Sequence, residues 1–230
     1  MCVPLFVRRC RRHAEPLLNL DVFLLRPVWT ANLANYFLNL AAMGSWLAWP
    51  LFFDRVWGYS TLATGLALTP APLLSGVVAA YGSQLSERFG ADLMVRVGSL
   101  VPIAANLLAF ALLREEANYW LVAAPAIALM GGGWALTQPP LNSAVMSQVG
   151  ADLYGQANAA FNTVRNIAGA MGIAIAVAVI GDPGRADVLD AYRRAFVAFT
   201  LSAAACWVVL MFLYPRVARA RGRARGLAPS

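Results

Sequence analysis

Long runs of apolar residues without charges alternate with short charged segments along this chain. A run of roughly 20 apolar residues forms a helix long enough to cross the roughly 30 Å hydrocarbon core of a bilayer. Six runs meet or approach this length: residues 28–53, 60–82, 94–113, 119–141, 156–181 and 195–214. The pattern predicts an all-α membrane protein built as one bundle of six transmembrane helices.

The pattern also divides the chain into three parts. Residues 1–27 form a basic lead and link, residues 28–214 form the bundle, and residues 215–230 form a basic tail. Of the 230 residues, 60% are hydrophobic and only 13% are charged, which is more apolar surface than one water-soluble core of this size can bury. The composition therefore supports the membrane assignment, with the lipid bilayer as the first partner.

The basic residues predict the orientation of the bundle. All 18 are arginines, and they give a formal net charge of +7. Twelve fall on the side that holds both termini, at positions 8, 9, 11, 12, 26, 88, 96, 216, 219, 221, 223 and 225, against five at positions 55, 114, 185, 193 and 194. Cytoplasmic loops carry an excess of arginine and lysine. We therefore expect a multi-pass protein of the plasma (inner) membrane with both termini cytoplasmic.

The basic clusters lie at the two chain ends and not along one face, which argues against nucleic acid as a partner. Cys2, Cys10 and Cys206 have no metal-ligand or paired spacing, so we expect free thiols and no metal site. His13 is the single histidine and lies in the lead, and no metalloprotease or phosphate-binding motif occurs. An enzymatic function is therefore disfavoured, and no cofactor is expected.

Arg165 lies inside the fifth run, about 15 Å from its predicted cytoplasmic start at 1.5 Å per residue. A central arginine costs roughly 2.5 to 3.5 kcal/mol on insertion scales, so its side chain should face protein or a wet cavity. Asn158, Asn162, Gly169 and Gly172 share its helical face. Two interpretations stay open: a role in a transport path or its gating, or structural pairing between helices.

None of the six runs contains a carboxylate that could neutralise Arg165, because every acid falls in a predicted loop or terminus. A proton-coupled machine needs a titratable group within the membrane. The counter-ion of Arg165 therefore has to come from outside this chain, or coupling does not occur in it.

Amides recur on two further runs. Asn32, Asn35 and Asn39 share one face of the first run, which should avoid lipid because an amide in hydrocarbon needs a partner. Gln138 and Asn142 follow Gly131–Gly133 in the fourth run and are candidate cavity-lining groups. Two explanations of Gly131–Gly133 stay open: close packing against other helices, or a flexible end of the helix. An aromatic group near the predicted outer edge is expected at the headgroups: Trp46, Trp49, Trp57 and Tyr59.

Seven residues in or directly before the fifth run stand at a characteristic spacing: Gly155, Asn162, Thr163, Arg165, Gly169, Gly172 and Ala174. This pattern resembles a signature helix of the fourteen-helix drug:proton antiporters in the major facilitator superfamily. The segments "FVRRCRRHAEPLLNLDVFLLRP" and "PLFFDRVWGYSTLATGLALTPAPL" are similar to stretches before and within the last six helices of those transporters. The resemblance implies the C-terminal half of a major facilitator fold, with Gly155, Gly169 and Gly172 as helix-packing positions.

The segment "GSQLSERFGAD" resembles the cytoplasmic loop motif of the same superfamily. The positions that carry the resemblance are Gly82, Leu85, Glu87, Arg88 and Gly90, where Glu87 replaces the usual aspartate. Asp92 stands where a basic residue is common, so the charge relay of this motif is incomplete. A solvated turn with ordinary surface charges is the alternative.

The resemblance implies one half of a proton-coupled exporter of drug-like or amphipathic small molecules. Such a half would act by alternating access with a complementary N-terminal half, and Arg165 would line or brace the shared cavity. The partners implied are that half, a small-molecule substrate and protons. Two alternatives stay open: an inactive truncated remnant, or a membrane interaction protein that pairs with a second copy or with another transporter.

Overall fold

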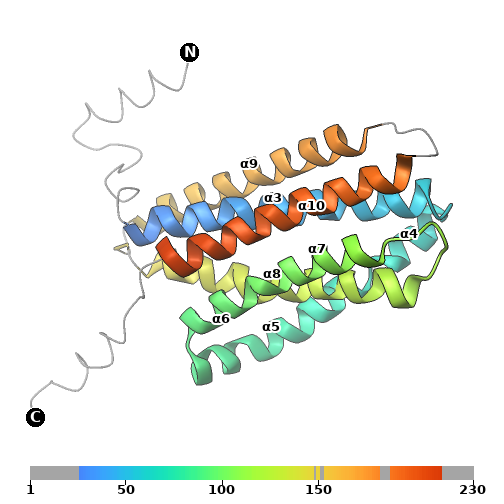
Figure 1. The fold of residues 1–230 in the computed structure, drawn as a ribbon. Coiled ribbons are helices and arrows are strands. Elements are labelled where there is room, and N and C mark those ends of the chain that lie inside the picture. Colours follow the sequence, from blue (N-terminus) through green and yellow to red (C-terminus); the bar gives the residue numbers. More distant parts are fainter. Residues whose placement is uncertain (1–25, 148, 151–152, 182–186, 214–230) are drawn as a thin grey trace, which may run out of the picture.

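The computed structural model describes residues 26–147, 149–150, 153–181 and 187–213, whose regular structure is all helical (Figure 1). The elements, in chain order, are α3 (Arg26–Arg55), α4 (Thr61–Ala67), α5 (Pro70–Phe89), α6 (Ala91–Gly98), α7 (Leu100–Leu112), η1 (Tyr119–Ala123), α8 (Ala124–Met146), α9 (Tyr154–Ile180), α10 (Val188–Val208) and η4 (Val209–Leu213). The elements η1 and η4 are single π-helical stretches continuous with α8 and α10.

The described helices follow the predicted runs but differ from them at several ends. The second and third runs are each divided, at Leu68–Thr69 and at Ser99. In a continuous helix a proline ring clashes with the carbonyl oxygen of the residue four positions earlier. For Pro72 and Pro102 these residues are Leu68 and Gly98, which lie at the two breaks. At the other ends, α5 continues to Phe89 and α10 begins at Val188, because charged residues that end an apolar run can still form helical hydrogen bonds.

Five described spans are long and apolar enough to cross a membrane: Thr61–Gly82, Leu93–Leu112, Tyr119–Ser143, Tyr154–Ile180 and Val188–Leu213. Helix α3 is not among them by hydropathy, although its 30 residues extend about 45 Å. Its polar side chains Thr30, Asn35, Asn39 and Ser45 are buried by the neighbouring helices, so they need not meet lipid. The fold is that of an all-α membrane bundle.

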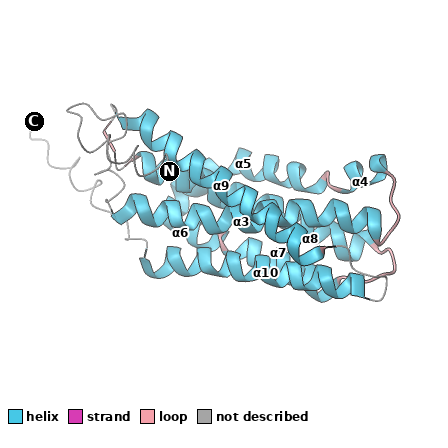
Figure 2. Cartoon of the chain, turned by 90° about the horizontal axis from the view of Figure 1, so that it is seen from above, coloured by secondary structure: helices cyan, strands magenta, loops and turns pink. Residues whose placement is uncertain are grey.

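The helices lie side by side, with α3 and α8 in the middle of the bundle (Figure 1). Helix α3 packs against α9 and α10, while α8 packs against α5 and α7. Figure 2 shows α5 and α9 toward one side of the bundle and α10 toward the other. We name the two ends of the bundle after the orientation predicted from the arginines: the end that holds Arg26, Met146 and Tyr154 is the inner end, and the end that holds Arg55 and Tyr119 is the outer end.

Aromatic side chains form the core of the outer end. Trp49 is 1% exposed and packs against Phe53 and Phe196, with ring centroids 5.5 and 5.2 Å apart. The prediction that Trp49 anchors at the headgroups is therefore wrong, because its position on α3 turns it toward α10 and into the bundle. Trp120, 82% exposed at the start of the span Tyr119–Ser143, has the exposure expected of a headgroup anchor instead.

The predicted lead and tail, residues 1–27 and 215–230, lie almost wholly outside the described residues. The same holds for Cys2, Cys10 and His13. Cys206 is described and is a buried free cysteine in α10.

Candidate functional site: a polar seam between α3, α8 and α9

Three buried amide side chains join α3 to α8 and α9. Asn39 Nδ2 lies 2.8 Å from Asn35 Oδ1 and 3.2 Å from Gln138 Oε1. Gln138 Nε2 donates to Asn35 Oδ1 at 3.0 Å, and Asn35 Nδ2 donates to the Phe161 carbonyl oxygen of α9 at 2.9 Å. Asn35 and Asn39 are 0% exposed and Gln138 is 5% exposed. The predicted amides of two separate runs therefore meet in one network.

The local sequence explains how these amides converge. Asn35 and Asn39 are four residues apart, so they lie one turn apart on the same face of α3. Asn39 Nδ2 also donates to the Asn35 carbonyl oxygen at 2.9 Å, which holds its side chain along the helix. Helix α8 runs antiparallel to α3 and places Gln138 between the two asparagines.

Asn32 and Asn142 lie nearer the inner end than this network. Asn32 is half-buried and donates through Nδ2 to the Val28 carbonyl oxygen of its own helix at 2.9 Å. Asn142 is also half-buried, one turn past Gln138 on α8. The polar faces predicted for both helices therefore continue past the amide network toward the inner end.

Arg165 is half-buried near the middle of α9, eleven residues from Tyr154 and about 16 Å along the helix. It lies on the same helical face as Phe161, Gly169 and Gly172, which are buried. No hydrogen bond or ion pair joins it to another described residue. The described acids lie at helix ends or in loops, so none of them neutralises the guanidinium.

Two predicted asparagines of α9 interact with one another and not with α3. Asn162 Nδ2 donates to Asn158 Oδ1 at 3.1 Å and to the Asn158 carbonyl oxygen at 2.9 Å. Asn158 is exposed and Asn162 is half-buried. Asn166, one turn further, is exposed near the middle of the helix. The sequence analysis did not name it, although it lies four residues after Asn162 and therefore on the same helical face.

The glycines of α9 divide into two kinds. A Cβ atom at Gly172 would meet the Leu40 carbonyl oxygen of α3, and one at Gly169 would lie 3.0 Å from Met43 Cγ. These two glycines let α9 and α3 approach closely. Gly155 is exposed and a Cβ there would meet nothing within 4 Å, so it has no such packing contact in the described part of the chain.

The loop motif lies mostly on helix. Gly82 and Arg88 belong to the last turns of α5, half-buried and exposed respectively, and Gly90 alone separates α5 from α6. Gly90 has φ +86°, a conformation that favours glycine. Leu85 and Glu87 are also helical, but their side chains lie outside what the structure describes. Among the described residues no cluster of histidine, cysteine or acid is arranged to hold a metal ion.

Comparison with known proteins places the chain among membrane carriers. A family model described as the Major Facilitator Superfamily matches residues 7–173. The transporter YebQ of Escherichia coli is 29% identical over 180 residues, which cover 78% of this chain and 39% of YebQ. The multidrug efflux pump LfrA of Mycolicibacterium smegmatis is 28% identical over 171 residues, which cover 74% of this chain and 33% of LfrA.

A third relative is the lincomycin resistance protein LmrB of Listeria monocytogenes, 25% identical over 177 residues. The match covers 76% of this chain and 37% of that protein. The chain thus spans less than two fifths of the length of these curated relatives.

Proposed function

Because the chain belongs to the Major Facilitator Superfamily, we propose that it forms one wall of a proton-coupled exporter of drug-like or amphipathic small molecules. Members of this family are carriers and not enzymes. In the proposal the chain corresponds to the C-terminal half of a fourteen-helix transporter and works with a complementary N-terminal half. Alternating access then comes from rocking of the two halves about a site near the bilayer midplane.

The observation that carries this proposal is the polar surface of α9 at mid-bilayer depth. Asn166 is exposed and Arg165 half-buried, about 18 and 16 Å along the helix from Tyr154. An amide or a guanidinium facing lipid at that depth is costly, so this face needs protein or water against it. A second half across an aqueous cavity supplies both.

The exposed side of α9 also fits contact with another helix. Ala170, Ala174 and Ala178 recur every four residues and are all exposed. Small residues at this spacing let transmembrane helices approach closely. Of the five spans, α4–α5 and α9 also have the smallest share of buried residues, 11% and 28%. Both lie toward the same side of the bundle (Figure 2).

In this proposal Arg165 lies beside the cavity and pairs with a carboxylate of the complementary half or with an anionic group of the substrate. The protonatable group that couples transport to protons belongs to the complementary half. The amide network of Asn35, Asn39 and Gln138 then braces the wall behind the cavity.

The proposal is tested with a chimera in which the chain follows the N-terminal part of a full-length relative such as LfrA. Export of a fluorescent drug from cells is the readout, with the amount of membrane-inserted protein measured in parallel. We expect Arg165→Ala to reduce export to background while insertion is unchanged. Arg194→Ala, which removes an exposed arginine of α10, is the matched control and should export at the parental rate. Parental export by Arg165→Ala would assign that residue a structural role.

The alternatives of the sequence analysis have their own tests. A remnant predicts that no chimera exports any drug even though the protein is inserted. Self-association is favoured by the same small-residue face of α9, and predicts a specific disulfide between two copies when Ala174→Cys is oxidised in a background without the natural cysteines. Reading the coding sequence upstream in the genome separates a split transporter from a frame-shifted remnant.

A further inference from the structure

The span formed by α4 and α5 is interrupted near its outer end. The two helices follow one another along one side of the bundle and are separated by Leu68 and Thr69, which we call the joint (Figure 2). The Thr69 N–H donates to the Leu66 carbonyl oxygen at 3.1 Å, and the Ala71 N–H donates to the Leu68 carbonyl oxygen at 3.3 Å. Both bonds span three residues, as in a 3₁₀ helix, and such a stretch within a longer helix often marks a hinge.

Two prolines keep the joint from closing into a continuous α-helix. Pro70 and Pro72 have no N–H, so neither can donate to the carbonyl oxygen four residues earlier, and each ring clashes with that carbonyl in a regular helix. The Ala71 N–H, which would meet the Ala67 carbonyl oxygen in an α-helix, bonds to Leu68 instead. The joint therefore takes away the backbone donor that the Ala67 carbonyl would normally have.

Tyr119 supplies a donor in its place. Its hydroxyl donates to the Ala67 carbonyl oxygen at 2.9 Å and so ties α4 to the span that begins with η1. Tyr119 is the first residue of the π-helical stretch η1, and such stretches occur frequently at functional sites. Its ring lies beside Phe53 of α3, with ring centroids 6.4 Å apart. A local departure from the α-helix on each side thus brings the hydroxyl and the carbonyl together.

The packing differs on the two sides of the joint. Of the seven residues of α4 only Ala67 is buried, while Leu62 and Leu66 are 75% and 65% exposed. Directly after the joint, α5 lies so close to α8 that a Cβ atom at Gly131 would overlap the Ala71 carbonyl. A segment held by few buried apolar contacts opens at a low free-energy cost. Helix α4 is therefore easier to displace from the bundle than α5.

From these contacts we infer that α4 is a hinged outer segment, and that Tyr119 is the latch that holds it against the bundle. When the latch opens, α4 turns about the joint, and water at the outer end takes the place of the phenol beside the Ala67 carbonyl. Exchanging one hydrogen-bond partner for water changes the free energy little, so both positions are accessible.

The inference goes beyond the proposed transport function, because the motion belongs to this chain and is measurable without a complementary half. In the proposed transporter, α4 lies on the same side of the bundle as α9 and therefore beside the complementary half (Figure 2). Opening of α4 would then widen the outer end of the cavity between the two halves.

The test is hydrogen–deuterium exchange of the full chain in nanodiscs, read by mass spectrometry over residues 61–69 and 73–82. In the parent chain we expect residues 61–69 to exchange at least about tenfold faster than residues 73–82, since only the first segment opens locally. Tyr119→Phe keeps the ring and removes the hydroxyl. It should speed exchange over residues 61–69 by a further three- to tenfold, roughly the effect of one hydrogen bond, and leave residues 73–82 unchanged.

Tyr192→Phe is the matched control for the loss of a hydroxyl. The Tyr192 hydroxyl is also buried, on α10, but has no hydrogen-bond partner among the described residues. Exchange over residues 61–69 should equal that of the parent chain in this variant.

A variant without the joint tests whether the latch acts through it. Pro70→Ala combined with Pro72→Ala restores both N–H donors and removes both ring clashes, so α4 and α5 should form one continuous helix. Adding Tyr119→Phe to this variant should change exchange over residues 61–69 by less than about twofold, because the segment can no longer turn.

Equal exchange of the two segments in the parent chain would overturn the inference, and so would unchanged exchange over residues 61–69 in Tyr119→Phe. Equal acceleration of both segments by Tyr119→Phe would mean a general loosening of the bundle and no latch. The same acceleration with and without the joint would mean that the hydroxyl holds α4 without a hinge. If exchange follows the expectation and the LfrA chimera exports nothing, the transport function fails and the latch stands.

Discussion

At Gly131 the lack of a side chain sets how closely two spans approach. A Cβ atom there would overlap the backbone of Ala71 in α5, and one at Gly133 would lie 2.9 Å from Val101 Cβ in α7. The run Gly131–Gly133 therefore packs α8 against helices on both sides. Of the two explanations that the sequence allowed, packing accounts for these glycines without any flexible hinge.

We expect Gly131→Ala to lower the free energy of unfolding by about 1 to 3 kcal/mol, because backbone atoms of α5 must move to admit the methyl group. Thermal unfolding in detergent micelles is the measurement. Gly76→Ala in α5 is the matched control, since a Cβ there meets nothing within 4 Å and alanine favours a helix over glycine. If both variants unfold at the parental temperature, the α5–α8 contact is not close-packed.

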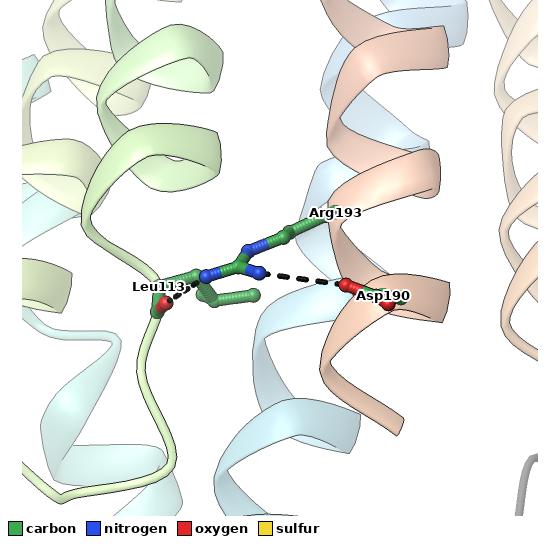
Figure 3. Close-up of polar contacts among 3 residues, drawn as sticks. All are labelled: Leu113, Asp190 and Arg193. Atoms are coloured by element: carbon green, nitrogen blue, oxygen red, sulfur yellow. Dashed lines mark hydrogen bonds and ion pairs between the residues drawn. The ribbon is translucent and has the colours of Figure 1, made fainter. Parts of the chain in front are cut away.

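At the scale of whole elements, arginines of the outer end cap helices other than their own. Arg193 of α10 donates through Nη2 to the Leu113 carbonyl oxygen at the end of α7, at 3.3 Å (Figure 3). Its Nη1 lies 3.4 Å from Asp190 Oδ1 of the same helix, an exposed pair that contributes little by itself. Arg55 of α3 donates in the same way to the Gly181 carbonyl oxygen at the end of α9, at 2.9 Å. Cations at helix C-termini satisfy free carbonyls and oppose the helix dipole.

Replacing Arg193 by methionine keeps most of the side-chain length and removes the cap. We expect faster hydrogen–deuterium exchange at the last turn of α7 and a loss of about 0.3 to 1 kcal/mol in the free energy of unfolding. Arg194→Met removes the neighbouring exposed arginine, which has no hydrogen bond or ion pair with another described residue, and should leave α7 unchanged. Equal exchange in the two variants would show that the Leu113 contact does not hold the helix end.

At the scale of the molecule, the two sides of the bundle meet different surroundings in the proposed transporter. Helices α9 and α10 lie toward opposite sides of the bundle (Figure 2). In the proposal Asn166, exposed on α9, faces the complementary half, and Leu201, 67% exposed on α10, faces lipid. The apolar surface of α10 is ordinary for a lipid contact, while the amide of α9 is not.

This difference predicts the reactivity of single cysteines in the LfrA chimera, made without the natural cysteines. Asn166→Cys should react with a water-soluble maleimide, because water fills the cavity in at least one state of the cycle. Leu201→Cys should stay unreactive, because hydrocarbon excludes the reagent. Reactivity at residue 201 and none at residue 166 would place the aqueous face on the opposite side of the bundle.

The sequence by itself determined the secondary structure and the environment of this protein. Charge-free runs are local features whose length and composition are sufficient to specify membrane helices, so the all-α bundle and the carrier family were both predictable. Helix ends were predicted less well, as at Phe89 and Val188, because hydrogen bonding within a helix continues past the first charged residue. The glycine spacing of α9 also indicated a close approach, although not its partner on α3.

Only the tertiary structure decided which polar groups meet. Asn39 and Gln138 are 99 residues apart and come into contact through the antiparallel packing of α3 and α8, whose register no local pattern contains. The same packing buries Trp49, leaves Asn166 exposed and leaves Asn39 Oδ1 without a hydrogen-bond partner among the described residues. Periodicity specifies the face of a helix on which a side chain lies, whereas its neighbours depend on how the helices pack, which involves residues far apart in the chain.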